Sequence, residues 1–461
     1  MTALTVALVL ILAITAIAFV AGRQKSLSTV GGELAELHSL PAHYGSYVLL
    51  WCLLPGIALL VLWAVIGPGW IESIIGSRLL AENPDLSVPQ LQLLINDIRN
   101  QVAGDVVSRD VDAALQVHVD AYASMIGQGQ LYTASAAILL TLLGGFIAYG
   151  QISPDMRARN RVEKVIRTIM VISSTVAILV TVGIVFSLLF ETGRFFEKVP
   201  FFEFLFGLQW SPQIALRADQ VASAGAFGAV PLFAGTLLIT FIAMVVAVPV
   251  GLMSAIYMTQ YANDRVRSMI KPVLEVLAGV PTVVYGFFAA LVVAPEIREL
   301  GESIGLNVAS ESALAAGLVM GIMIIPFMSS LSDDALTAVP QSMRDGAYAL
   351  GATKAETIRN VLIPAALPGI VGAFLLSVSR AVGETMIVVM AAGLAANLTA
   401  NPLEAVTTVT VQIVTLLTGD QEFDSAKTLA AFALGLVLFT VTLALNVVAL
   451  RVVQKYREQY E

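Results

Sequence analysis

Charged residues are scarce in this chain of 461 residues, at 13%, about half their share in a soluble domain. The net charge is −8 and basic residues form no patch, so nucleic acid is not an expected partner. The single cysteine, Cys52, has no partner for an intrachain disulfide, and three histidines without ligand spacing predict no metal site. The Gly-Lys dipeptide of a P-loop is missing, so we expect no ATP site of that kind and no cofactor held by the chain itself.

The sequence instead contains long apolar runs, and 57% of its residues are hydrophobic. A helix needs about 20 apolar residues to cross a bilayer core of about 30 Å. Continuous runs of that length exclude a membrane β-barrel, whose strands have about 10 residues of alternating polarity. The predicted fold class is an all-α polytopic membrane protein with about nine transmembrane helices. The charge-free runs are 1–22, 37–71, 121–154, 168–190, 220–263, 276–295, 312–332, 360–379 and 428–450.

Basic residues indicate how these spans are oriented. Arg23 and Lys25 follow the first run instead of preceding it, which favours a retained helix with its N-terminus outside over a secretory signal. With nine spans, the segments then predicted inside carry twice as many Lys and Arg as those outside, in line with the positive-inside rule. The inside segments are 23–43, 152–167, 259–271, 331–361 and the tail from 451.

Two outside segments are longer than simple turns. Residues 72–128 form an acidic insert in which apolar side chains recur at helical spacing between 91 and 106. Such a stripe is expected to pack against the neighbouring spans. The second segment, roughly 193–228, contains phenylalanine pairs and Trp210, and we expect these aromatic residues to anchor the chain at the membrane interface.

The inside loop 331–361 contains two capping-box patterns. Ser342 is followed three residues later by Asp345, and Thr353 is followed by Glu356; in this pattern each side chain caps a backbone group of the other residue. Gly351 lies between them, where a helix can end in a left-handed residue. The spacing predicts a helix, a sharp glycine turn and a second helix, which together form a rigid knob suited to docking. An ordinary loop between spans is the alternative.

The same residues resemble the EAA loop of ABC-transporter permeases. That loop has an acidic residue, Gly or Ala, and Ala, then Gly at the seventh position and an aliphatic-x-aliphatic-Pro ending at the twentieth. Here Asp345, Gly346 and Ala347 are followed by Gly351 at the seventh position and Pro364 at the twentieth. Pro364 is predicted in the first turn of the next span. Asp345 replaces the usual Glu of this loop and Gly346 the usual Ala, and both departures are mild. The resemblance implies that the loop inserts into a cleft of a separate ATPase subunit.

Arg380 and Glu384 lie near the middle of the membrane, with long uncharged stretches on both sides. A charge there is costly and usually faces a bundle interior or a pathway. Four residues apart on one helix, the two side chains could meet, so a self-neutralising structural pair is the alternative. Because apolar replacement of such pairs is often neutral or stabilising, we favour a role in a substrate pathway.

The pair also suggests a substrate. A guanidinium presents a planar fork of donors that matches two oxygens of an oxyanion. Glu384 would repel a fully deprotonated anion but can accept a hydrogen bond from one that still carries a proton. Phosphate carries one at neutral pH, whereas sulfate and molybdate do not. This argument favours phosphate.

Over roughly 165–455 the chain resembles the PstC-type permease family of phosphate-specific ABC transporters. The resemblance implies a six-helix permease core, spans four to nine, with Arg380 and Glu384 as residues of the phosphate pathway. Residues 1–164 then form an N-terminal extension with three spans and the outside insert. Glu275, near the cytoplasmic end of the sixth span, is a gate residue or a structural one. The segments that carry the resemblance are 204–212, 274–286, 332–336 and 380–386.

The resemblance also implies partners and a location. The partners are a PstA-type second permease, two copies of an ATPase and an outside phosphate-binding protein, in a bacterial plasma (inner) membrane. Import of another oxyanion, such as sulfate, molybdate or phosphonate, is one alternative function. A non-conducting scaffold or sensor subunit is another. An enzyme is disfavoured, because no nucleophile–base or paired-acid arrangement occurs apart from Arg380 and Glu384.

Overall fold

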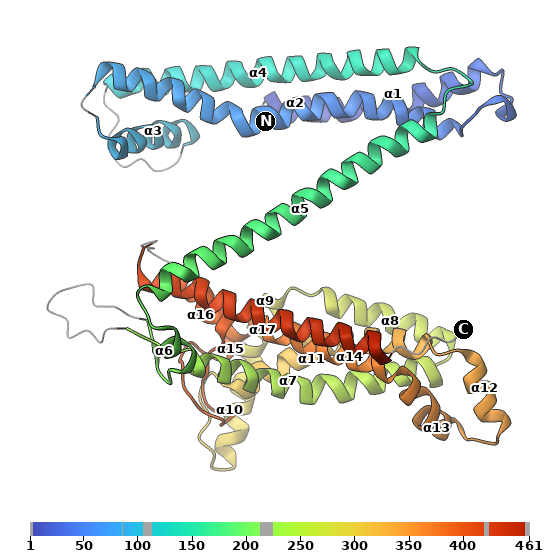
Figure 1. Ribbon diagram of the computed structural model, residues 1–461, viewed down its shortest axis with the longest axis vertical. Helices are drawn as coiled ribbons and strands as arrows, with labels where there is room; N and C mark the ends of the chain where they lie inside the picture. The colour runs from blue at the N-terminus through green and yellow to red at the C-terminus, as the bar shows by residue number, and fades with distance from the viewer. Residues whose placement is uncertain (1–2, 85, 105–112, 213–224, 419–423, 457–461) are drawn as a thin grey trace. The chain divides into compact units, whose positions relative to one another are not determined.

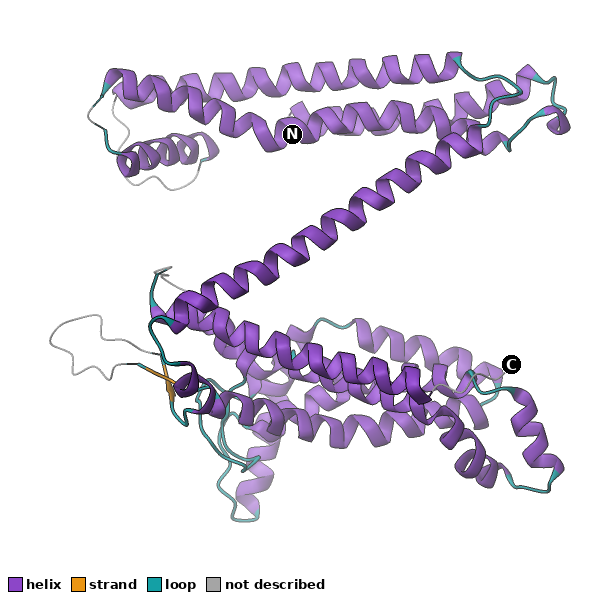
Figure 2. Cartoon of the chain, in the orientation of Figure 1, coloured by secondary structure: helices purple, strands orange, loops and turns teal. Residues whose placement is uncertain are grey.

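The computed structural model describes residues 3–84, 86–104, 113–212, 225–418 and 424–456, and helices account for nearly all of them (Figure 2). Within these ranges eight helices are long and apolar enough to cross a membrane, and a bent pair of helices can form a ninth span. The predicted class, an all-α polytopic membrane protein, is confirmed. The chain divides into two compact units, Met1–Ile178 and Leu179–Glu461.

Unit 1 is built on three long helices that pack side by side (Figure 1). Glycines allow close contact, since a Cβ atom on Gly144 would lie 2.1 Å from the carbonyl oxygen of Trp51. Small residues commonly bring membrane helices together in this way. The elements of unit 1 are α1 (Ala3–Thr29), a 3₁₀ turn (Leu34–Glu36), α2 (Pro41–Glu82), α3 (Val88–Ala103), α4 (Ala113–Gly150) and the first part of α5 (Ala158–Phe196).

The outside insert is largely helical. Helix α2 runs on to Glu82, and α3 is a separate amphipathic helix that begins at a capping box between Ser87 and Gln90. The buried side chain of Ile98 packs α3 onto α2 and α4, which confirms the predicted packing of the stripe. Val102 remains exposed, and Val106 lies outside the described residues.

Unit 2 is centred on α7 and α11, which lie side by side along their length (Figure 1). Gly317 and Gly321 of α11 face Ile242 and Val246 of α7 without room for a side chain. The elements are α6 (Phe201–Phe206), β1 (Trp210–Ser211), β2 (Ala226–Phe227), α7 (Val230–Ile256), a π-helix (Tyr257–Tyr261), α8 (Asp264–Gly279), α9 (Thr282–Phe288), a π-helix (Ala289–Val293), α10 (Ala294–Ser303), α11 (Ala313–Thr337), α12 (Gln341–Ala349), α13 (Lys354–Thr357), a π-helix (Ile358–Leu362), α14 (Ile363–Val382), α15 (Met386–Ala391), α16 (Val409–Leu417) and α17 (Ala426–Tyr456).

The sixth predicted span, 276–295, is not one straight helix. Helix α8 ends at Gly279, and the next helical segment begins at Thr282 with a bend of 86°. Pro281 explains the break, since proline disfavours the helical conformation of the residue before it. The bent pair is either a broken span or a re-entrant segment.

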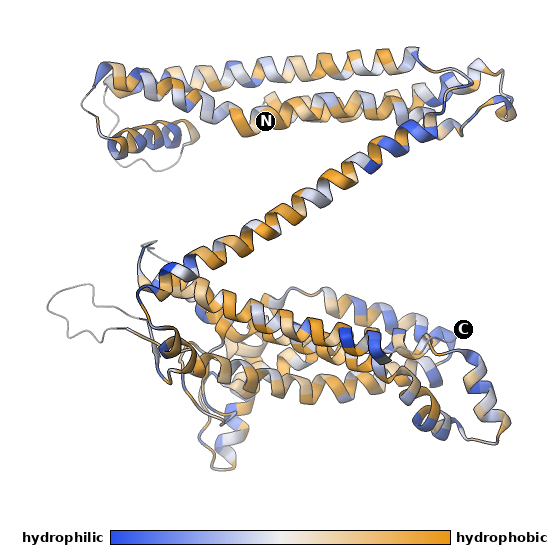
Figure 3. Cartoon of the chain, viewed as in Figure 1, coloured by the Kyte–Doolittle hydropathy of each residue, from blue (hydrophilic) through white to orange (hydrophobic). Residues whose placement is uncertain are grey.

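The two ends of unit 2 differ in character. Helix α6 and the β1–β2 hairpin lie at one end, whereas α12 and α13 lie at the other (Figure 1). Hydrophilic residues gather on α8, α12 and α13, while apolar residues cover the long helices (Figure 3). This distribution agrees with the prediction that 259–271 and 331–361 lie outside the apolar spans.

The aromatic segment does more than anchor the chain. Phe195 and Phe204 are fully buried, and their rings pack edge to face 5.1 Å apart. Trp210 is also buried, and its indole N–H donates to Oε1 of Gln412 at 2.9 Å. Phe202 is 74% exposed and remains available for the interface. These aromatics therefore form part of the core at this end. Aromatic side chains bury large apolar areas, and edge-to-face ring pairs add further stabilisation.

Replacing Gln412 with Met should lower the stability of the protein by about 1–3 kcal/mol, because the Trp210 N–H would be left buried and unpaired. Thermal unfolding of the detergent-solubilised protein measures the change. Gln209→Met is the matched control, since Gln209 is exposed. Equal unfolding temperatures for the two variants would contradict this account.

Candidate substrate pathway and coupling loop

The loop before α14 has the predicted helix–turn–helix form. Helix α12 ends before Gly351, whose φ of 85° is left-handed. The N–H of Gly351 bonds to the carbonyl of Tyr348 at 2.9 Å, and the N–H of Ala352 bonds to that of Ala347 at 3.1 Å. These two bonds form a Schellman motif. Gly351 therefore sets the angle at which the chain leaves α12.

One of the two predicted capping boxes is present. Thr353 and Glu356 cap each other's backbone at the start of α13, as predicted. The prediction of a capping box between Ser342 and Asp345 is wrong. Helix α12 starts one residue after its N-cap, Pro340, so Ser342 already lies inside the first turn, and Asp345 instead accepts a hydrogen bond from the Gln341 side chain at 3.2 Å.

The second helix of the loop is not separate from the following span. Helix α13, the π-helix Ile358–Leu362 and α14 follow one another without a break, so Lys354–Val382 forms one helical segment of 29 residues. Pro364 lies in the first turn of α14, as predicted, directly after the π turn. Because proline has no N–H to donate, a local change of helix type is a common way to accommodate it. A displacement of the loop can therefore be carried along this helix into the membrane.

Side-chain contacts fix the loop to the rest of unit 2. Arg344 of α12 donates to the carbonyl of Leu336 at the end of α11, at 3.0 Å. The ammonium group of Lys354 lies 4.7 Å from the ring centroid of Tyr261, beyond α7. Leu350, next to the glycine turn, is 91% exposed. The loop thus has a fixed base and an apolar tip directed away from the unit.

Thr353→Ala should loosen α13. Losing an N-cap costs about 1 kcal/mol, so we expect amide exchange of residues 354–357 to become roughly fivefold faster, as that free energy implies. Hydrogen exchange read by mass spectrometry measures it. Ser342→Ala should leave exchange in α12 unchanged, and equal effects of the two variants would contradict the assignment of the caps.

The structure places Arg380 and Glu384 on different elements. Arg380 lies in the last turn of α14, which ends at Val382, and Glu384 follows in the turn before α15. Gly383 favours this break, since glycine is a weak helix former. The prediction that both residues share one helical face is therefore wrong, and no ion pair within 4.0 Å joins these two described side chains.

Each of the two side chains has its own neighbour. The guanidinium of Arg380 lies over the ring of Phe327, 5.7 Å from its centroid, and Arg380 is exposed in the isolated chain. Oε1 of Glu384 accepts hydrogen bonds from the N–H groups of Met386 and Ile387, at 3.1 and 3.4 Å. Glu384 therefore caps α15, and its charge does not neutralise Arg380 at contact distance.

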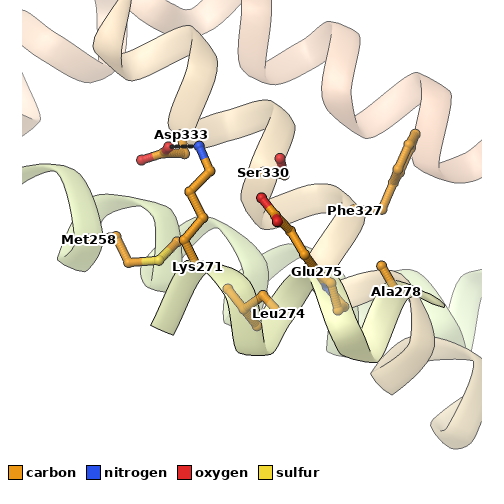
Figure 4. Close-up of a pocket in the computed structure, with 9 residues that line it drawn as sticks. Met258, Lys271, Leu274, Glu275, Ala278, Phe327, Ser330 and Asp333 are labelled. Carbon is orange, nitrogen blue, oxygen red and sulfur yellow. Dashed lines mark hydrogen bonds and ion pairs between the residues drawn. The ribbon is translucent and has the colours of Figure 1, made fainter. Parts of the chain in front are cut away.

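A cavity of about 170 Å³ lies between α8 and α11 (Figure 4). Glu275 and Lys271 of α8 line it together with Phe327, Ser330 and Asp333 of α11. Phe327 is the residue over which Arg380 lies. Glu275, predicted near the cytoplasmic end of the sixth span, is thus a residue of the cavity that Phe327 also lines.

Sequence reasoning missed the charge cluster at this cavity. The side chain of Asp333 is only 2% exposed. Nη2 of Arg267 lies 3.2 and 3.0 Å from its two carboxylate oxygens, and Nζ of Lys271 lies 3.4 Å from one of them. Asp333 ends the charge-free run 312–332 and looks like an ordinary span boundary. The two cations of the loop 259–271 were the available signal, since a buried acid needs partners.

A comparison with known families identifies the class of protein. A family model described as "Binding-protein-dependent transport system inner membrane component" matches residues 247–458, which contain the EAA-like loop 331–361 (the coupling loop), the cavity and Arg380. A second model, described as "Phosphate ATP-binding cassette transporter", matches residues 8–180. The fold and the first match define a permease subunit of an ABC importer.

Individual relatives narrow the class to a family. The chain is 36% identical to the probable ABC transporter permease protein YqgH of Bacillus subtilis, over 52% of this chain and 74% of that relative. It is 34% identical to the phosphate transport system permease protein PstC 1 of Mycobacterium tuberculosis, over 50% of this chain and 73% of that one. It is 32% identical to PstC of Haemophilus influenzae, over 50% and 78%. The chain belongs to the PstC-type permease family.

The comparison with solved structures also gives a match. An inward-facing MetNI methionine ABC transporter matches with a TM-score of 0.37 and 19% identity, over 50% of this chain and 95% of that one.

Proposed function

We propose that this chain is the membrane-spanning permease subunit of an ATP-driven importer, and that it moves inorganic phosphate across the bacterial plasma (inner) membrane. The observation that carries the proposal is the position of Arg380. It lies in the last turn of a helical segment that begins at the coupling loop, and no acid within 4.0 Å neutralises it among the described residues. The relatives with the printed function of phosphate transport support the choice of substrate.

The chemistry of the pathway follows from these two residues. Arg380 offers a positive charge and a planar fork of donors, which lowers the cost of bringing an anion into the membrane. Glu384 keeps part of its acceptor capacity after capping α15, because a carboxylate has about four lone-pair sites. It can therefore accept a hydrogen bond from the protonated oxygen of hydrogen phosphate, while it repels fully deprotonated anions such as sulfate.

Partners complete the transporter in this proposal. A PstA-type permease forms the second half of the path, and a phosphate-binding protein delivers the anion from outside. Two copies of an ATPase bind the coupling loops, so ATP is hydrolysed on a separate subunit and this chain needs no cofactor of its own. Co-purification of the four kinds of protein in detergent tests the assembly. The residues assigned to ATPase coupling are Asp345, Gly346, Ala347, Gly351 and Pro364.

The coupling loop transmits the work of the ATPase. Movement of α12 reaches the end of α11 through the Arg344–Leu336 hydrogen bond, and movement of α13 reaches Arg380 along a continuous helix. The first route enters α11, which lines the cavity, and the second ends at Arg380, whose guanidinium lies over Phe327. ATP binding and hydrolysis would then alternate the exposure of Arg380 between outside and inside.

Competition between oxyanions tests the substrate. Uptake of radiolabelled phosphate by the reconstituted transporter should be blocked by excess unlabelled phosphate and should persist in excess sulfate, molybdate or phosphonate. Inhibition by sulfate at the same concentrations as phosphate would assign the chain to another oxyanion. Full uptake by a complex that lacks this chain would instead assign it a scaffold or sensor role.

A further inference from the structure

The cavity between α8 and α11 contains a cation that the buried acid beside it does not require. Arg267 contacts both carboxylate oxygens of Asp333, whereas Lys271 approaches only one, at 3.4 Å. The side chains of Arg267 and Lys271 are similarly exposed, at 34% and 38%, so the contact geometry is what separates the two cations. A buried carboxylate is stabilised by a partner with good geometry, and Arg267, which contacts both oxygens, is the better placed of the two cations. Lys271 therefore brings surplus positive charge to the cavity wall.

An acid shares this wall with Lys271. Glu275 follows it by four residues on α8, so both side chains lie on one face of the helix, and both line the cavity (Figure 4). No ion pair within 4.0 Å involves Glu275 among the described residues. A cation next to an acceptor that is not engaged in an ion pair is the combination of groups already found at Arg380 and Glu384. It suits an anion that still carries one proton.

The position of the cavity connects it to Arg380. Phe327 lies next to both, since its ring lies under the guanidinium of Arg380 and the residue is part of the cavity lining. From Phe327 to Asp333 the axis of α11 advances about 9 Å toward α12, which is the end predicted to face the cytoplasm. With that orientation, Asp333 and its partner Lys271 lie on the cytoplasmic side of Phe327.

The cavity is large enough for such an anion. Its volume of about 170 Å³ corresponds to several water molecules at roughly 30 Å³ each. Its walls are mostly apolar, and Lys271, Glu275, Ser330 and Asp333 supply the polar groups. A mostly apolar pocket with a few convergent polar groups is typical of small-ligand sites.

We propose that this cavity is a second, cytoplasmic-side binding site for hydrogen phosphate, in which Lys271 binds the anion and Glu275 accepts its proton in a hydrogen bond. The inference rests on the proposed function, phosphate import through Arg380, and adds an exit site to it. Asp333 holds Lys271 when the site is empty and competes with the anion for it. This competition keeps binding weak enough for release.

Chemical rescue of a cysteine variant tests the charge of Lys271. In a Cys52→Ala background, Lys271→Cys should slow phosphate uptake by reconstituted complexes about tenfold, the effect of losing one charge-assisted hydrogen bond. Aminoethylation of the new thiol with a methanethiosulfonate reagent restores an ammonium group and should restore most of the uptake. The sulfonatoethyl reagent adds a negative charge and should not. Arg265→Cys is the control; it is exposed, lines no part of the cavity, and should respond to neither reagent.

A combined variant separates binding from a structural ion cluster. If Lys271 only helps Arg267 to neutralise Asp333, uptake should recover in Arg267→Gln, Lys271→Gln, Asp333→Asn, because none of the three charges remains. If Lys271 binds the anion, the combined variant stays as slow as Lys271→Gln. Recovery in the combined variant, normal uptake by Lys271→Cys, or equal rescue by the two reagents would overturn the proposal.

These outcomes are separate from a failure of the proposed function. The Cys52→Ala background retains Lys271, so its own phosphate uptake tests import as such. If the background imports phosphate and the Lys271 variants do so equally well, only the exit site is wrong. If the background imports no phosphate while it hydrolyses ATP and takes up another anion, the proposed function is wrong.

Discussion

Arg380→Met should reduce phosphate uptake by about tenfold to a hundredfold while the complex still assembles and hydrolyses ATP. A hydrogen bond to a charged group contributes about 1.5–3 kcal/mol, and each 1.4 kcal/mol corresponds to a factor of ten. Methionine keeps the apolar contact with Phe327 but cannot attract an anion. Radiolabelled uptake by proteoliposomes, with ATPase activity measured in parallel, gives both quantities.

The double variant Arg380→Met, Glu384→Gln excludes a structural explanation. If the two residues only neutralised each other, removing both would restore uptake, because no unpaired charge would remain. We expect no restoration, since the side chains form no ion pair and Glu384 instead caps α15. Glu384→Gln alone should be milder than Arg380→Met, because an amide oxygen still accepts those hydrogen bonds. Recovery of uptake in the double variant would refute the pathway assignment.

Gly351→Val should uncouple ATP hydrolysis from uptake in a protein that still reaches the membrane. The φ of 85° at this position is a genuine outlier for a β-branched residue, and such backbone strain costs about 1–3 kcal/mol. A side chain there would meet no neighbouring atom within 4 Å, so the effect arises from the backbone alone. The turn should open and direct α13 away from its present angle.

Two other substitutions serve as comparisons for Gly351→Val. Gly351→Asn should be the milder change at that position, because asparagine tolerates the left-handed region. Gly346→Ala lies five residues earlier inside α12, where a Cβ atom also meets nothing within 4 Å, and alanine should strengthen the helix by about 1 kcal/mol. Coupling should be normal in Gly346→Ala. If it is lost equally there, the backbone of Gly351 is not the determinant.

Sequence patterns predicted the parts of this protein that depend on local rules. Apolar runs located the spans because each helix must satisfy its backbone within the bilayer. The left-handed conformation of Gly351 and the cap at Thr353 followed from residue types that few other conformations accept. The helix–turn–helix form of the EAA-like loop was predicted for the same reason.

Features that depend on competition between neighbours were harder to predict. Arg380 and Glu384 have the spacing of a helical pair, but capping of α15 by Glu384 and the glycine before it ended α14 early. The cluster around Asp333 required knowledge that α8 bends and packs on α11, which spacing along the chain cannot give. Ser342 has the sequence pattern of a helix N-cap, but the N-cap of α12 is Pro340.

The most direct test of the account is ATP-dependent accumulation of phosphate by the complete transporter in proteoliposomes. With the phosphate-binding protein outside and ATP supplied to the ATPase subunits, phosphate should accumulate, and sulfate at the same concentration should not. Replacing Arg380 by Met should remove accumulation without removing ATP hydrolysis. Accumulation that is independent of ATP, or equal accumulation with Met at position 380, would contradict the claim that this chain forms the phosphate path.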